Sequence, residues 1–290
     1  MTRIKLIKRE FCPFCKNNLY KDLYSLSYNN TLLKKFLIKY YKNKKLIEYI
    51  KNDFYIISEC LNCKGLFQKN IPNEKFMHFL YEKLISKEIS FNKKINFSTF
   101  NYRNILEELT LIEKILKKTS RNISILEFGS GWGFWSRFAK ACNFNLTCSE
   151  LSKIRSKSDN YSNIDVIKDL NIKKKFDVIY SEQTLEHLEN PLATINTFTR
   201  LLKKTGIMIL KFPTSINFKS KLKKNYIPLK DCAHPLEHIN IINRDCFKIM
   251  IKKNNIKIIN FKSFYNFSMR SFLKDLKNII FFDNVWLKKD

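Results

Sequence analysis

The sequence lacks any long apolar run. No stretch approaches the ~20 consecutive apolar residues that a membrane-spanning helix needs, although hydrophobic residues make up 44% of the 290-residue chain. The first segment, MTRIKLIKREFCPFC, has neither a long apolar core nor a small-residue cleavage site, so it does not have the features of a secretory signal. We therefore expect no membrane span and a cytoplasmic location, with the 8 cysteines reduced or metal-bound rather than paired as disulfides.

Acidic residues are few relative to basic ones: 26 Asp and Glu stand against 54 Lys and Arg, and the formal net charge is +28. A basic face is what nucleic-acid phosphates need, so a polyanionic partner is one interpretation of this charge. The lysines, however, are spread through nearly every segment, and Asn, Ile and Phe are also abundant while Ala is rare. This pattern favours a compositional bias typical of AT-rich genomes over selection for a nucleic-acid partner.

Glycine is also scarce, yet three of the 5 glycines fall within one stretch, Glu127 to Gly133, which has the pattern E-x-G-x-G-x-G. The stretch follows a short apolar run and precedes an aromatic and basic segment with helical character. Clustered glycine indicates positive φ angles or the close approach of a ligand. The order of strand, glycine turn and helix presents backbone N–H groups to an anionic ligand. A dinucleotide fingerprint is excluded, because Phe134 stands three residues after Gly131.

This glycine stretch resembles the first motif of the class I S-adenosylmethionine (SAM)-dependent methyltransferases, and the resemblance extends over residues 122–261. Phe176 to Tyr180 is similar to the family's strand with an FD start, and Leu185 to Leu188 is similar to its LEH segment. Alternating strand and helix signals indicate a parallel sheet covered on both faces. The expected strands are 123–128, 144–148, 164–167, 176–180, 207–213 and 256–261. We therefore expect an α/β fold: a Rossmann-like class I methyltransferase sheet with helices on both faces.

The resemblance implies SAM as the methyl donor and assigns residues to it. Glu150 lies about twenty residues beyond Gly129, where an acidic side chain can accept hydrogen bonds from both ribose hydroxyls. Asp169 matches the acidic position beside the adenine in the family. The cofactor-binding residues implied in this way are Glu127, Gly129, Ser130, Gly131, Gly133, Glu150, Asp169, Leu170 and Ser181.

Two C-x-x-C pairs precede this region, Cys12 with Cys15 and Cys60 with Cys63. Four thiolates in two such pairs can close a tetrahedral zinc site. A redox-active C-x-x-C would need a thioredoxin-like βαβ context, which the flanking sequence lacks, and four unrelated buried cysteines are the other alternative. We expect structural Zn²⁺ in a small zinc-ribbon-like region. The layout also resembles the N-terminal zinc-binding region of a methyltransferase group that includes enzymes acting on nucleotide-linked sugars.

These segments divide the chain into three expected parts: a zinc-binding region over residues 1–97, a SAM-binding methyltransferase domain over 98–265, and a C-terminal tail over 266–290. Within the first part we expect an amphipathic helix over residues 76–86, followed by a polar linker over 87–98. Apolar residues between Ile105 and Leu116 recur at helical spacing, which predicts a helix packed on the sheet. The aromatic tail predicts either a last antiparallel strand or an interaction surface.

The candidate catalytic residues are His238, Glu237 and His187. Methyl transfer from a sulfonium requires the protein mainly to position an acceptor and to take up its proton, for which a neutral imidazole is suitable. Glu237-His238 resembles the EH pair of the sugar C-methyltransferases in this group, where the histidine acts as base, and His187 matches their second histidine. The alternative is that His238 only fastens a loop to the sheet. Unlike that group, in which a tyrosine commonly precedes the pair, this chain has His234-Pro235-Leu236 before it.

The sequence therefore predicts a SAM-dependent methyltransferase of a small metabolite, a sugar or nucleotide-linked sugar, methylated on carbon or oxygen. The alternatives are an RNA methyltransferase that uses its basic surface and zinc module, and a non-catalytic SAM-binding scaffold. Against the RNA alternative, residues 181–184 (SEQT) lack the N/D-P-P-Y/F signature of enzymes that methylate base amines. The intact glycine stretch argues against a scaffold. The expected partner is thus a small-molecule acceptor, and the sequence sets no oligomeric state.

Overall fold

The computed structural model describes residues 3–223, 225–252, 254–259 and 283–289. They form two compact units, each assembled from separate stretches of the chain. Unit 1 comprises Met1–Ser86, Leu185–Leu192 and Pro213–Met250, and unit 2 comprises Lys87–Thr184, Ala193–Phe212 and Ile251–Asp290. The division into contiguous ranges expected above stays a prediction.

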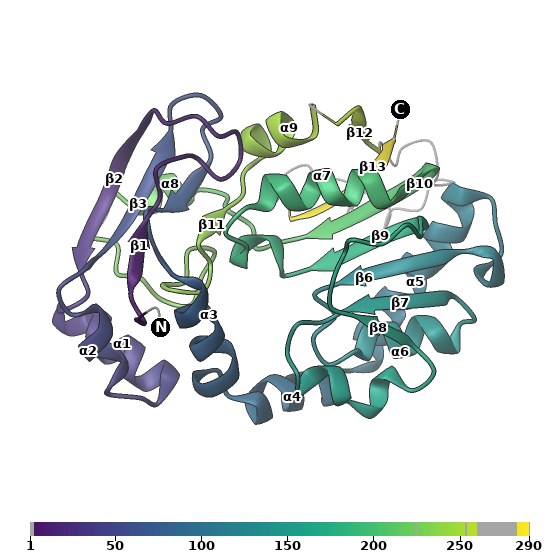
Figure 1. The fold of residues 1–290 in the computed structure, drawn as a ribbon, viewed down its shortest axis with the longest axis horizontal. Coiled ribbons are helices and arrows are strands. Elements are labelled where there is room, and N and C mark those ends of the chain that lie inside the picture. The colour runs from purple at the N-terminus through teal and green to yellow at the C-terminus, as the bar shows by residue number, and fades with distance from the viewer. Residues whose placement is uncertain (1–2, 224, 253, 260–282, 290) are drawn as a thin grey trace. The chain divides into compact units, whose positions relative to one another are not determined.

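Unit 2 contains a seven-stranded sheet with the order β12-β13-β10-β9-β6-β7-β8. The strands β6 to β10 run parallel, whereas β13 is antiparallel to both of its neighbours, β10 and β12. Helices cover both faces, so the predicted Rossmann-like methyltransferase sheet is confirmed (Figure 1). The strand bounds are β6 Ser124–Phe128, β7 Asn145–Ser149, β8 Asp165–Ile167, β9 Phe176–Glu182, β10 Leu202–Lys211, β12 Ile256–Ile258 and β13 Asn284–Lys289.

The strand order reverses at β6, which has β7 on one side and β9 on the other. In an open α/β sheet, ligands bind outside the carboxyl ends of the strands at such a reversal. The neighbouring strand β9 is apolar on both faces, with Val178, Ile179 and Tyr180 fully buried, as expected for a central strand of a parallel sheet. The glycine stretch follows β6 directly and therefore lies at the edge where a ligand is expected.

The helices of unit 2 pack on this sheet or lie beside the glycine stretch. They are α4 Lys87–Ile95, α5 Thr99–Leu116, α6 Phe134–Ala141 and most of α7 Pro191–Leu201. The predicted stripe of α5 is buried at Leu109 and Ile112. The predicted polar linker is instead helix α4, because Phe91 packs against Trp132, with ring centroids 5.0 Å apart. A single half-buried aromatic ring in a polar stretch is a weak periodic signal, which is why the pattern of the sequence did not indicate this helix.

The carboxylate of Asp177, at the start of β9, binds residues from three other segments of unit 2: the turn just after α5, β6 and β10. It accepts hydrogen bonds from the ammonium groups of Lys118 and Lys203, each at 2.7 Å, and from the hydroxyl and amide of Ser124 at 2.7 and 2.9 Å. Burial by itself raises the pKa of Asp177, but these donors outweigh it and hold the pKa well below its usual range. The charged form is therefore the one that the folded state favours.

We expect Asp177→Asn to lower the free energy of unfolding by about 2 kcal/mol at pH 7, since it removes charge-assisted hydrogen bonds from partly exposed lysines. The pKa of Asp177 is lower in the folded chain than the ~3.9 of an unfolded one, so its contribution is complete at neutral pH and is lost as the pH falls below about 4. Urea denaturation at pH 7 and pH 3 measures both effects. The exposed Asp165, changed to Asn, is the control, and equal stability of Asp177→Asn and wild type at pH 7 would contradict the expectation.

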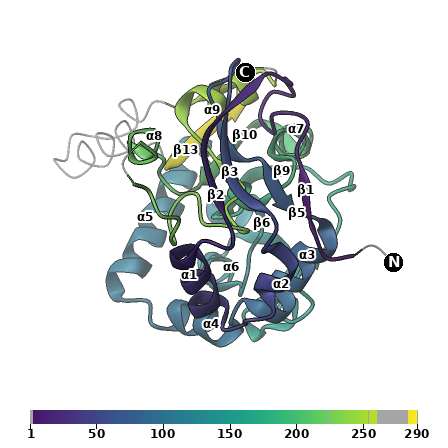
Figure 2. The same cartoon turned by 90° about the vertical axis from the view of Figure 1, so that its left-hand side faces the viewer.

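Unit 1 contains a four-stranded antiparallel sheet with the order β11-β4-β3-β2 and a separate pair formed by β1 and β5. Figure 2 turns the molecule so that β2 and β3 face the viewer. The strand bounds are β1 Leu6–Lys8, β2 Tyr20–Ser27, β3 Phe54–Cys60, β4 Leu66–Gln68, β5 Asn70–Pro72 and β11 Asn240–Ile241. The helix bounds are α1 Thr31–Tyr41, α2 Leu46–Ile50, α3 Glu74–Phe79 with a following π-helical turn Leu80–Leu84, α8 Phe218–Lys221 and α9 Arg244–Lys252, whose last two residues belong to unit 2.

The core of unit 1 shows how the insertion between the cysteine pairs folds. Helix α1 begins where the side chain of Asn30 accepts hydrogen bonds from the amides of Leu32 and Leu33, and it buries one face through residues spaced four apart, Leu33 and Leu37. Strand β11 pairs with β4, which brings residues 213–250 into this unit. Within the described residues, no helix is both long and apolar enough to cross a membrane.

Candidate functional site

The glycine turn after β6 has three left-handed residues, with φ of +71° at Gly129, +61° at Gly131 and +72° at Gly133. A side chain at Gly129 would collide with Thr184, and one at Gly133 would meet the ring of Tyr161 at 2.8 Å. At Gly131, by contrast, no atom lies within 4 Å of the position that a Cβ would take. Two of the glycines are thus required by packing as well as by φ, and the third borders open space where a ligand can approach the main chain.

Glu150 holds this turn in place. One carboxylate oxygen accepts a hydrogen bond from the amide of Gly131 at 2.7 Å, and the other accepts one from the amide of Ser152 at 2.7 Å. The residue is 8% exposed. These two contacts fix the orientation of the carboxylate beside the open space at Gly131. Gly131 and Glu150, both predicted cofactor residues, are therefore brought together.

Three other predicted cofactor residues are buried and tie the site to the sheet. The carboxylate of Glu127 accepts a hydrogen bond from the hydroxyl of Ser136 on α6. The hydroxyl of Ser130 lies 2.7 Å from that of Tyr161, and the hydroxyl of Ser181 donates to the carbonyl of Phe128 at 3.1 Å. Their side chains shape the turn and its link to β9.

Asp169 and Leu170 follow β8, which is separated from β6 by β7. Asp169 is exposed and accepts a hydrogen bond from the amide of Asn171 at 2.9 Å, and Leu170 is half-buried. Sequence reasoning missed Leu151, which directly follows Glu150 and is 73% exposed. This edge of the sheet therefore carries an exposed apolar side chain beside the buried carboxylate, and the place of Leu151 immediately after Glu150 was the available signal.

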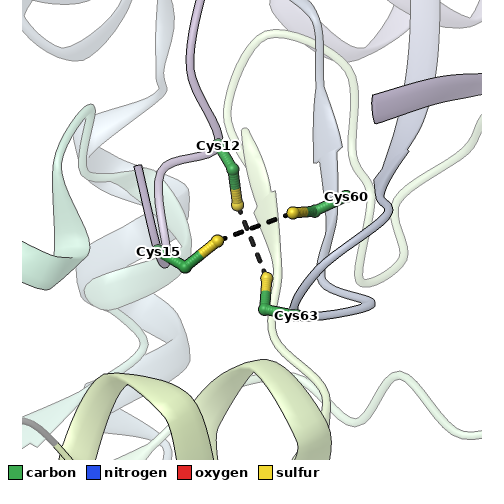
Figure 3. Close-up of side chains that lie close together, drawn as sticks. All are labelled: Cys12, Cys15, Cys60 and Cys63. Atoms are coloured by element: carbon green, nitrogen blue, oxygen red, sulfur yellow. Dashed lines mark hydrogen bonds between the residues drawn. The ribbon is translucent and has the colours of Figure 1, made fainter. Parts of the chain in front are cut away.

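The four predicted zinc ligands converge in unit 1, and Figure 3 shows their sulfur atoms pointing toward a common centre. The Sγ atoms of Cys12 and Cys63 are 3.5 Å apart, as are those of Cys15 and Cys60, and all four lie within 4.8 Å of one another. Four sulfurs placed ~2.3 Å from a tetrahedral zinc ion are about 3.8 Å apart, so the cluster fits this metal.

The backbone repeats the same turn at both cysteine pairs. The amide of Lys16 donates to the carbonyl of Cys12 at 3.0 Å, and the amide of Lys64 donates to that of Cys60 at 3.1 Å. Both lysines have positive φ, +62° and +58°. Two matching turns, one after β1 and one between β3 and β4, aim both thiols of each pair at one point, as a metal knuckle requires.

His187 and His238, from separate stretches of the chain, come together in unit 1 with ring centroids 4.8 Å apart. Nδ1 of His187 lies 2.9 Å from the carbonyl oxygen of Glu237, and Nδ1 of His238 lies 2.7 Å from that of Asp231. A carbonyl can only accept, so each Nδ1 carries the hydrogen, and Nε2 of the neutral ring carries the lone pair. Burial, with the neighbouring histidines, lowers the pKa of His238 to about 3, so this ring is neutral near pH 7.

The carboxylate of Glu237 lies in a buried hydrogen-bond network. Its Oε1 accepts a hydrogen bond from the hydroxyl of Tyr41 at 2.8 Å and lies 3.1 Å from Nε2 of His234. Burial by itself raises the pKa of Glu237, but the hydrogen bond from His234, the nearby histidines and Tyr41 together lower it to about 2. The carboxylate is therefore ionised at neutral pH and anchored to its own unit.

Asn240, which sequence reasoning missed, holds the two histidine segments together. Its side-chain amide donates to the carbonyls of Leu185 at 2.9 Å and Leu188 at 2.6 Å, on either side of His187. Its oxygen accepts a hydrogen bond from the guanidinium of Arg9 at 2.8 Å. Because Asn240 is the first residue of β11, it couples the turn that bears His187 to the strand that follows His238.

Gln68 supports the same segment from β4. Its side-chain nitrogen donates to the carbonyls of His234 at 2.9 Å and His238 at 3.0 Å. Neither Asn240 nor Gln68 stands in a local pattern that would mark it, since their partners lie far away in the sequence.

Comparison with known proteins places the chain in a family. A family model described as "Methyltransferase domain" matches residues 101–260. No curated protein sequence matches the chain. Among solved structures, the plantazolicin methyltransferase BamL, in complex with a triazolic desmethylPZN analog and SAH, is 15% identical, with a TM-score of 0.51, covering 73% of this chain and 94% of its own.

Two further structures are more distant in shape. The plantazolicin methyltransferase BpumL, in complex with the triazolic analog and SAH, is 18% identical with a TM-score of 0.48, covering 74% of this chain and 94% of its own. A SAM-dependent methyltransferase from Mesorhizobium loti is 12% identical with a TM-score of 0.42, covering 62% and 96%. The family match spans more than half of the 290 residues. This chain therefore belongs to the methyltransferase family and is an enzyme of the SAM-dependent methyltransferase class.

Proposed function

We propose that this methyltransferase transfers the methyl group of SAM to a carbon or oxygen of a small metabolite, a sugar or a nucleotide-linked sugar, with His238 as the general base. The observation that carries the proposal is the histidine cluster of unit 1, in which the ring orientation of His238 presents the lone pair of Nε2. The methyl group is supplied by the cofactor, so a positioned proton acceptor is the main chemical group that the protein must add.

SAM is proposed to bind unit 2 at the glycine turn, with Glu150 accepting hydrogen bonds from the ribose hydroxyls. The open space beside Gly131 and the buried, oriented carboxylate of Glu150 support this placement. Leu151 would supply apolar surface for the adenine, and Asp169 an acceptor beside it. The structure of BamL holds SAH, the product that SAM leaves after methyl transfer, on a similar fold.

The cysteine cluster is proposed to hold a structural Zn²⁺ ion. Four cysteine ligands fill a tetrahedral shell and leave no position for a substrate, so the metal would stabilise unit 1 rather than take part in methyl transfer. The cluster joins the turn after β1 to the ends of β3 and β4, which are strands of the same unit that bears the histidines. Metal binding would therefore support the strands on which Gln68 and Asn240 hold the histidine segment.

In this proposal His187 and Glu237 assist His238. His187 stacks edge-on against the ring of His238, and its Nδ1 donates to the carbonyl of Glu237, which fixes the ring beside the proposed base. The carboxylate of Glu237, engaged with Tyr41 and His234, positions the loop that carries His238. His238 is thus the group that takes the acceptor proton, and Glu237 acts through the loop.

The experiment is a transfer assay with methyl-labelled SAM against a panel of nucleotide sugars, with cellular RNA as a parallel acceptor. We expect label in a nucleotide sugar and a product one methyl heavier, and a His238→Ala variant that loses at least about 100-fold in kcat while its SAM affinity changes less than about twofold. The exposed His78, changed to Ala, is the control. Label only in RNA would reject the small-molecule acceptor, and wild-type turnover by His238→Ala would remove it as the base.

A further inference from the structure

We propose that Glu186, His187 and His238 form a second metal site, which binds a divalent first-row transition ion such as Zn²⁺, Fe²⁺ or Co²⁺. The site is built from residues different from the cysteine cluster, and all three belong to unit 1. Two imidazoles and one carboxylate form a ligand set that protein sites use for such ions, with further coordination positions left open.

The geometry brings the ligand atoms within reach of one ion. One nitrogen of each histidine and one carboxylate oxygen of Glu186 all lie within 4.8 Å of one another, and Nε2 of His187 is 3.8 Å from Oε1 of Glu186. Ligands at ~2.1 Å from a tetrahedral ion are about 3.4 Å apart. Side-chain movements of a few tenths of an ångström to about 1 Å would therefore close the site around an ion.

The outer contacts of both histidines are those of metal ligands. Nδ1 of His187 donates to the carbonyl of Glu237, and Nδ1 of His238 donates to the carbonyl of Asp231. Histidines that bind a metal through one nitrogen almost always donate the other N–H to a carbonyl or carboxylate, which fixes the ring and its tautomer. Nε2 is therefore the nitrogen of each ring through which a metal would bind, because Nδ1 already donates to a carbonyl.

The third ligand brings negative charge to a buried position. The side chain of Glu186 is 1% exposed. A divalent ion between Glu186 and the two imidazoles would be held by the carboxylate as well as by the two ring nitrogens. The site is also preorganised, because Asn240 holds the turn of Glu186 and His187 at its two ends through Leu185 and Leu188.

The inference deepens the proposed function and shares residues with it. Nε2 of His238 has one lone pair, which either takes the acceptor proton or binds an ion. Metal occupancy and base catalysis by His238 therefore exclude each other, so added transition metal would inhibit methyl transfer. The metal site itself depends on no step of the reaction, and its binding can be measured without SAM or an acceptor.

The test is a Co²⁺ titration of the full chain whose cysteine cluster has first been loaded with Zn²⁺, followed by visible absorption and metal analysis after dialysis. We expect one Co²⁺ bound per chain in addition to the zinc, with ligand-field bands but without the sulfur-to-cobalt absorption that cysteine ligands produce. His187→Ala and His238→Ala should each weaken Co²⁺ binding by about 10- to 100-fold or more, and His78→Ala should bind as wild type does.

Glu186→Gln is the variant that preserves shape, and thermal melting of each variant shows whether it is folded. Glu186→Gln should also weaken Co²⁺ binding, because an amide is a poorer ligand than a carboxylate. Absence of Co²⁺ beyond the cysteine cluster, or an equal affinity in Glu186→Gln, His238→Ala and wild type, would overturn the metal site. Failure of methyl transfer to nucleotide sugars with Co²⁺ binding intact would instead overturn only the proposed function.

Discussion

Replacement of Glu150 by alanine is expected to weaken SAM binding by at least about 100-fold. Two hydrogen bonds from ribose hydroxyls to a carboxylate contribute about 1.5 kcal/mol or more each, and a loss of about 3 kcal/mol corresponds to about a 100-fold change in Kd. The variant also leaves the amides of Gly131 and Ser152 without the acceptor that orients the turn. Isothermal titration with SAM and with SAH measures the loss.

Two companion variants separate the causes of this loss. Glu150→Gln keeps the shape but replaces one oxygen by an NH₂ group, which must face the amide of Gly131 or of Ser152, so we expect weakened binding here too. Glu107→Ala, an exposed glutamate in α5 of the same unit, is the matched control and should bind SAM as wild type does. Unchanged affinity in Glu150→Ala would show that Glu150 is not the ribose contact.

If the cysteine cluster holds the proposed Zn²⁺ ion, its loss should have the largest effect on stability. Binding of structural zinc by small cysteine sites is worth about 10–16 kcal/mol at pH 7, which is comparable to the total stability of a domain. We expect Cys60→Ser, or a strong chelator, to unfold the sheet of unit 1. Metal analysis should show the loss of zinc, and near-ultraviolet circular dichroism should show the loss of the signal of the buried Tyr28 and Tyr55.

The control for this experiment is Cys142→Ser, since Cys142 is a half-buried cysteine of unit 2 that is not part of the cluster. It should keep one zinc per chain and the signal of the unit 1 tyrosines. If Cys60→Ser retained a full equivalent of zinc and an unchanged melting temperature, the cluster would be neither a zinc site nor a stabilising element.

The parts of the fold that could be predicted from the sequence have local signals. The apolar runs of β6 and β9 are short and bounded by turns, and the helical stripe of α5 recurs from Ile105 to Leu116. The contact between Glu150 and the glycine turn could also be predicted, because the carboxyl ends of neighbouring parallel strands lie at the same edge of the sheet. Helix α4 was not, because its contacts come from only a few side chains: Phe91 packs against Trp132 and Phe134, and Ser90 accepts a hydrogen bond from the indole of Trp132.

The histidine site required more than local pattern. The sequence marked His187 and His238 singly, but they lie some fifty residues apart, and Glu186 was marked only as part of the LEH segment, with no role assigned to it. Their meeting depends on the pairing of β11 with β4 and on Asn240, which binds the turn before and after His187. Such contacts join distant segments and leave no periodic trace in the chain.

The sequence by itself determined which chemical groups each segment carries. These are a glycine turn whose backbone has no side chains in the way of a ligand, acidic residues at strand ends, and two cysteine pairs with the spacing of metal knuckles. These features can be recognised in the sequence because each one involves residues close together in the chain. The right-handed connections between parallel strands then place the strand ends at one edge of the sheet. Only the tertiary structure decided which segments share a unit, and it placed residues 185–192 and 213–250 with the cysteine cluster. The physical reason is that burial and strand pairing act between segments distant in the chain, so that the grouping of Glu186, His187 and His238 is a property of the packed core.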